Sequence, residues 1–103
     1  MTILATPVTR ACEYAKKPLS YIMTPCNKRE AVEARWAFWF YLVIEEGWSL
    51  TRSARRIKYD HTTVLYGLRK YAAEHLGTDP KATLEDIRQA AQAPLLKLME
   101  EAA

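Results

Sequence analysis

The chain has 103 residues and a net charge of +3, and half of its residues are hydrophobic. This length supports a single hydrophobic core, and so high an apolar content with only three glycines argues against wholesale disorder. The basic charge is local, because residues 50–70 hold six Lys and Arg against one Asp, whereas residues 71–103 hold three against six. A basic segment of this kind is expected on a surface that faces a polyanion.

Membrane, secreted and metal-binding proteins are not indicated. The longest apolar run, residues 36–44, is about half as long as a membrane span requires. Residues 1–10 lack the basic and apolar regions of a signal peptide. Cys12 and Cys26 are isolated and have no metal-ligand spacing. They could form one disulfide, but we expect reduced, partly buried thiols in a cytoplasmic protein.

The first third of the chain predicts two short helices. Thr6 is a suitable N-cap and Pro7 a suitable first residue for a helix that runs to about Lys17. Pro18 then begins a second helix over residues 19–23, which ends before the next proline.

A long helix is expected next. Asn27 and Glu30 have the spacing of a capping box, and the helix that they begin should run to about Glu46 and stop at Gly47. Its second half, residues 36–44, is apolar on every side, which favours a central core helix. The alternative is that part of this surface serves a dimer or a partner protein.

Two further helices follow at close spacing. Ser49 caps a helix over residues 50–57, and after a break at Lys58 and Tyr59, Asp60 caps another that runs to about Leu76. The residues expected to face inward are Leu50, Ala54 and Ile57 in the first helix and Val64, Leu65, Leu68 and Ala72 in the second.

A last helix is predicted to open at Asp79-Pro80, with a kink at Pro94. Its apolar stripe is Leu84, Ile87, Ala91, Leu95 and Leu98. The expected fold is therefore all-α: a compact helical bundle over residues 1–77 that contains a helix-turn-helix, with an added C-terminal helix over residues 78–103.

Two short helices joined by a tight break, the first with outward Arg52, Arg55 and Arg56, are typical of a DNA-binding helix-turn-helix. The start of its second helix offers unpaired backbone N–H groups and the positive end of the helix dipole, which attract phosphate. Thr62 and Thr63 add hydroxyls for phosphates and methyls for thymine.

The two residues before these threonines have alternative roles. His61 is expected to contact a base or a phosphate, although it could also be an exposed residue with no role in binding. Asp60 could accept a hydrogen bond from a cytosine amino group, or it could serve only as the helix cap.

The sequence motifs of these two helices resemble those of a known family. Ser49-Leu50, then Asp60-His61-Thr62-Thr63-Val64 and the Arg69-Lys70 pair are similar to the C-terminal DNA-binding domain of the bacterial chromosomal replication initiator family, DnaA. The resemblance covers residues 7–75. One departure is the turn, where the family has a Gly-rich segment and this chain has Lys58-Tyr59.

The resemblance implies a second contact to DNA, made by an arginine of a basic loop that enters the minor groove. Arg29 is the best match, with Lys28 and Arg35 as alternatives; otherwise this segment is a solvated helix start with acidic neighbours. Of Arg69 and Lys70, one is expected on a phosphate and one in solvent. The predicted DNA-binding residues are Lys28, Arg29, Arg35, Ser49, Leu50, Arg52, Arg55, Arg56, Lys58, Tyr59, Asp60, His61, Thr62, Thr63, Tyr66, Arg69 and Lys70.

An enzyme is not expected. The initiator's ATPase loop, GxxxxGK[ST], is absent, and His61 and His75 have no matching nucleophile or metal set, so neither a cofactor nor a metal is predicted. We expect a sequence-specific double-stranded DNA-binding protein of the cytoplasm and nucleoid, a small bacterial or phage regulator of transcription or replication initiation. The alternative is an interaction module whose apolar helix surfaces bind a replication or transcription protein. A homodimer is left open.

Overall fold

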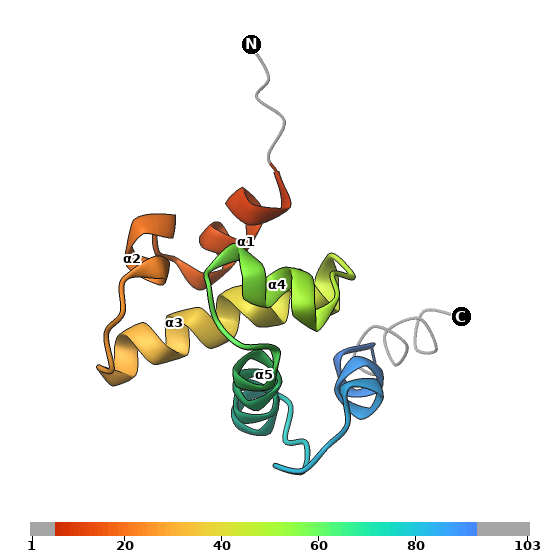
Figure 1. Cartoon of the computed structure of the whole chain (residues 1–103). Helices are drawn as coiled ribbons and strands as arrows, with labels where there is room; N and C mark the ends of the chain where they lie inside the picture. The colour runs from red at the N-terminus through yellow and green to blue at the C-terminus, as the bar shows by residue number, and fades with distance from the viewer. Residues whose placement is uncertain (1–5, 93–103) are drawn as a thin grey trace.

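The computed structural model describes residues 6–92, and this part of the chain consists of helices joined by short turns, without a strand (Figure 1). The all-α fold predicted from the sequence is confirmed. In chain order the elements are α1 (Pro7–Ala15), α2 (Leu19–Met23), α3 (Arg29–Phe40), the π-helical turn η1 (Tyr41–Glu45), α4 (Leu50–Arg56) and α5 (His61–His75), and residues 84–92 are also helical.

The start of α1 is the predicted one. Thr6 is its N-cap, and the Thr6 side chain accepts a hydrogen bond from the backbone N–H of Thr9 at 3.1 Å, with proline in the first turn. The helix ends slightly earlier than predicted, because Lys16 takes the left-handed conformation with φ of 60°. The second helix, α2, has the predicted bounds.

The predicted capping box at the start of α3 is wrong. The N-cap is Lys28, which makes no side-chain capping bond. The carboxylate of Glu30 instead accepts a hydrogen bond from Lys17 Nζ at 2.7 Å, and this long-range ion pair takes it away from the helix start. At its other end α3 passes into η1, after which Gly47, with φ of 76°, stops the helix as predicted.

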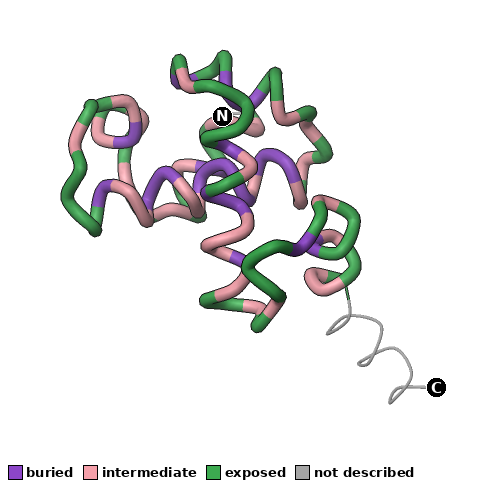
Figure 2. The backbone as a smooth tube through the Cα atoms, turned by 60° about the horizontal axis from the view of Figure 1, so that its bottom comes forward, coloured by how far each residue is buried: buried purple, intermediate pink, exposed green. Residues whose placement is uncertain are grey.

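The apolar run over residues 36–44 forms the centre of the core, as predicted. Phe38 and Leu42 are fully buried, Trp39 is 1 % exposed, and α3 packs against α1, α2 and α5. Figure 2 shows this burial along the middle of the molecule. In the described part of the chain only Tyr14 and Tyr66 are large exposed hydrophobic residues, so residues 36–44 offer no broad apolar surface to a partner.

The last helix begins later than predicted. Asp79 accepts from the backbone N–H of Lys81 and shapes a turn, whereas Thr83 and Asp86 form the capping box of the helical residues 84–92. Asp-Pro therefore marks a turn here rather than a helix start. Ile87 is fully buried in the main core cluster, so the helical residues 84–92 pack against the same core. The predicted roles of Pro94, Leu95 and Leu98 lie outside the described residues.

Candidate nucleic-acid interface

The first helix of the predicted helix-turn-helix, α4, has one buried and one basic face. Ser49 caps it, since the Ser49 hydroxyl accepts a hydrogen bond from the backbone N–H of Arg52 at 3.1 Å. Ala54 and Ile57 are buried as predicted, whereas the three arginines Arg52, Arg55 and Arg56 are exposed. The guanidinium of Arg52 lies 3.9 Å from the ring centre of Trp48, which holds it against the start of the helix.

The turn from α4 to α5 depends on an unusual lysine. The N–H of Lys58 donates to the carbonyl of Arg55 at 3.3 Å, and the N–H of Tyr59 donates to the carbonyl of Ala54 at 2.9 Å. This pair of bonds is a Schellman motif, which requires a left-handed residue. Lys58 fills that place with φ of 58°, a conformation that costs a non-glycine residue about 1 kcal/mol. A positive charge therefore occupies a position that favours glycine.

The first turn of α5 is open to solvent. Asp60 Oδ1 accepts hydrogen bonds from the backbone N–H of Thr62 at 2.8 Å and from its hydroxyl at 2.7 Å. These two bonds hold the pKa of Asp60 below its ordinary value. His61 Nδ1 lies 3.5 Å from the same oxygen, and His61, Thr62 and Thr63 are all exposed. The aspartate is thus the helix cap, as predicted.

Further along α5, the exposed face carries an aromatic residue. Tyr66 is 55 % exposed, and the ammonium of Lys70 lies 5.5 Å from its ring centre. The ring of Trp36 from α3 meets Tyr66 edge-on, with centroids 6.4 Å apart. Gly67 lets Trp36 approach, because a Cβ at that position would lie 2.5 Å from Trp36 Cδ1.

Two of the predicted contact arginines have internal partners instead. Arg35 is only 5 % exposed, and its guanidinium donates to the backbone carbonyls of Thr24 and Cys26. The prediction that Arg35 contacts DNA is therefore wrong. Arg69 is partly buried, and its Nε donates to the carbonyl of Ala82 at 2.9 Å, so it ties α5 to the link before residues 84–92 rather than projecting outward.

Tyr59 and Leu50 also face inward. The Tyr59 ring is half-buried, with the Arg35 guanidinium 5.5 Å from its centre and the Trp39 ring edge-on at 5.2 Å. Leu50 is half-buried against the core. Both residues support the helix-turn-helix from inside.

The segment that resembles the family's basic loop forms the first turn of α3. Lys28 and Arg29 are exposed there, but Arg29 Nε donates to Glu33 Oε1 at 2.9 Å. This bond, together with attraction to Glu74 in the second half of α5, raises the pKa of Arg29. The arginine therefore lies among carboxylates, and the structure does not bring it to the first turn of α5.

The basic face of α4 and the first turn of α3 differ in their charge environment. In residues 6–92 the basic side chains of α4 take part in no ion pair, whereas Lys17 and Arg29 do.

Residues 6–92 hold no group of His, Cys, Asp and Glu that could bind a metal ion, and none of the helices in this range has the length and apolar character of a membrane span. Sequence reasoning missed two supporting residues, Trp48 and Trp36. Trp48 had a signal, since it directly precedes the Ser49 cap of α4.

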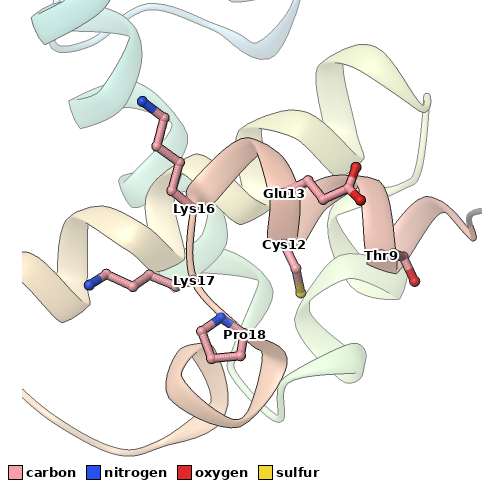
Figure 3. A pocket seen from close by; sticks show the side chains of 6 residues that line it. All are labelled: Thr9, Cys12, Glu13, Lys16, Lys17 and Pro18. Carbon is pink, nitrogen blue, oxygen red and sulfur yellow. The ribbon is translucent and has the colours of Figure 1, made fainter.

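A hollow of about 340 Å³ near the end of α1 is the other feature of interest (Figure 3). Lys16 and Lys17 point away from Cys12 there, so the lining side chains do not converge on a common point. Burial raises the pKa of the Cys12 thiol, and Arg56 only partly opposes this shift. We assign no site to this hollow.

Comparison with protein-family models, curated proteins and solved structures finds no match for the chain. The initiator-like reading therefore rests on the residues quoted from the sequence and on the geometry of α4 and α5 described above.

Proposed function

We propose that this chain is a sequence-specific double-stranded DNA-binding protein that places α5 in the major groove. The observation that carries the proposal is that two sets of exposed side chains lie on either side of one tight turn. On one side are the outward arginines of α4, and on the other is the open first turn of α5 with His61, Thr62 and Thr63. This is the arrangement by which a helix-turn-helix contacts backbone and bases together.

We assign phosphate contacts to α4 and the turn after it, and base contacts to the first turn of α5. Arg52, Arg55, Arg56 and Lys58 are suited to phosphates, because their charges are exposed and lie on or beside α4. Such contacts fix the protein on the duplex without reading its sequence. His61, Thr62 and Thr63 are suited to base edges, with the Asp60 cap holding the turn in shape.

Biologically, this activity fits a small bacterial or phage regulator that occupies sites at a promoter or an origin, in the cytoplasm and on the nucleoid. The proposal gives it no catalytic role. The alternative, an interaction module, would need an apolar docking surface. The apolar residues 36–44 are mostly committed to the core, which favours the DNA-binding proposal over that alternative.

The test is a titration of labelled duplexes, one selected by the full chain from a random library and one scrambled, at low and moderate salt. Arg55→Ala should weaken both duplexes similarly and make binding less salt-dependent, by about one unit of the log–log slope. Thr63→Ala should weaken only the selected duplex, by about 1–3 kcal/mol. Lys81→Ala removes one exposed charge outside the helix-turn-helix and is the matched control.

Failure has a distinct signature. If selection enriches no sequence, or if Arg55→Ala and Lys81→Ala behave alike while Thr63→Ala binds as wild type does, the helix-turn-helix is not a DNA-binding surface.

A further inference from the structure

We infer that Tyr66 reads the C5-methyl group of a thymine, and that Trp36 holds its ring in place to do so. This inference rests on the proposed function and names one chemical feature of the DNA that the exposed face of α5 would recognise. It begins from the exposure of Tyr66, which is 55 % although its ring contacts two neighbours.

Tyr66 lies at the middle of the proposed reading face. At 3.6 residues per turn, Tyr66 is rotated by about 40° from Thr62 and by about 60° from Thr63, and it falls between them. It stands one turn further along the helix. If the two threonines face base edges, Tyr66 faces them too, rather than the phosphates that border the groove.

The ring is held rather than loose. Trp36 meets it edge-on at 74° between ring planes, and the Lys70 ammonium lies 5.5 Å from its centre. Trp36 can reach this place only because position 67 is glycine. A side chain that is held before binding loses less conformational entropy when it is buried, so it is well suited to recognition.

The partner follows from the chemistry of the groove. An exposed aromatic ring gains most from apolar surface, and the thymine methyl is the one apolar group that bases present in the major groove. Burial of one methyl group corresponds to about a fourfold change in affinity. Guanine and adenine edges are polar at the equivalent place and would leave the ring without such a partner.

The experiment uses the full chain and the duplex that it selects from a random library. Each thymine is replaced in turn by deoxyuridine, which lacks only the methyl group. Wild type should lose about fourfold in affinity at one position. Tyr66→Ala should bind the thymine and deoxyuridine forms of that position equally, whereas Tyr66→Phe should keep the preference. Tyr14→Ala, which removes the other exposed tyrosine, should also keep it.

Trp36→Leu tests the support. It should reduce the methyl preference when Tyr66 is present and have no effect on it in the Tyr66→Ala background. Circular dichroism of each variant shows whether it is folded, and Tyr66→Phe against wild type remains informative if an alanine variant is not.

Three results separate the outcomes. If Tyr66→Ala keeps the methyl preference at every position, or weakens all duplexes equally, Tyr66 does not read thymine. If Tyr66→Ala keeps the methyl preference while Thr63→Ala loses specificity in the same series, the proposed function stands and this inference falls. If no duplex is selected at all, both fall.

Discussion

Replacement of Gly67 by alanine should destabilise the protein, although alanine is the better helix former. A Cβ at this position would lie 2.5 Å from Trp36 Cδ1 and 3.2 Å from Trp39 Cε3, and Trp39 is almost fully buried. Overpacking of this kind costs about 1–3 kcal/mol, whereas the helix propensity gained is about 1 kcal/mol. The first distance is far below van der Waals contact, so we expect the upper part of the range to apply and a net loss of about 1–2 kcal/mol.

Urea denaturation of four proteins measures this: wild type, Gly67→Ala, Trp36→Ala and the double variant. Without the Trp36 ring the main clash is gone, and the looser contact with Trp39 remains. Gly67→Ala should therefore be neutral or slightly stabilising in the Trp36→Ala background. An equal loss of stability in both backgrounds would refute the reasoning, because the cost would then not arise from the Trp36 contact.

Three other changes have defined outcomes. Lys58→Gly should raise the free energy of unfolding by about 1 kcal/mol, because it relieves the left-handed lysine, and should weaken binding to all duplexes at low salt. Arg35→Lys should lower the melting temperature while Arg55→Lys leaves it unchanged, because the buried Arg35 donates to two backbone carbonyls whereas Arg55 is exposed. Hydrogen bonds from Arg10 hold the pKa of Glu46 below its ordinary value, so the stabilisation from this ion pair is present above the ordinary pKa and is lost as the pH falls through the lowered one. Wild type and Glu46→Gln should therefore converge in stability in acid.

The helix starts that the sequence predicted correctly are those set by local chemistry. Thr6, Ser49 and Asp60 each bond a backbone N–H two or three residues ahead, so the cap and its partner lie in the same short stretch. Asn27 had the same spacing signal and failed. The reason is Lys17, thirteen residues from Glu30, which pairs with the carboxylate that the capping box needed.

The errors in the candidate site have a similar origin. The resemblance to the initiator family marked Arg35 and Arg69 as DNA contacts, but each donates to a backbone carbonyl of a distant loop. A signal for Arg35 was present, since it stands three, four and seven residues before Phe38, Trp39 and Leu42, on the face of α3 that is buried. No local pattern could have assigned Arg69, because its partner lies beyond Gly77.

The internal contact of Arg69 lowers the number of charges in residues 50–70 that can bind phosphate. The segment holds six basic residues, but Arg69 is engaged with Ala82 and leaves five for phosphates. Since each neutralised phosphate contributes about −0.9 to the slope of log affinity against log salt, this segment supports a slope no steeper than about −4.5. A steeper measured slope would require phosphate contacts from elsewhere, and the exposed first turn of α3 is one candidate source. That turn carries the exposed Lys28 and also Arg29, which would have to leave Glu33; because an exposed ion pair contributes little to stability, DNA could recruit the arginine at little cost.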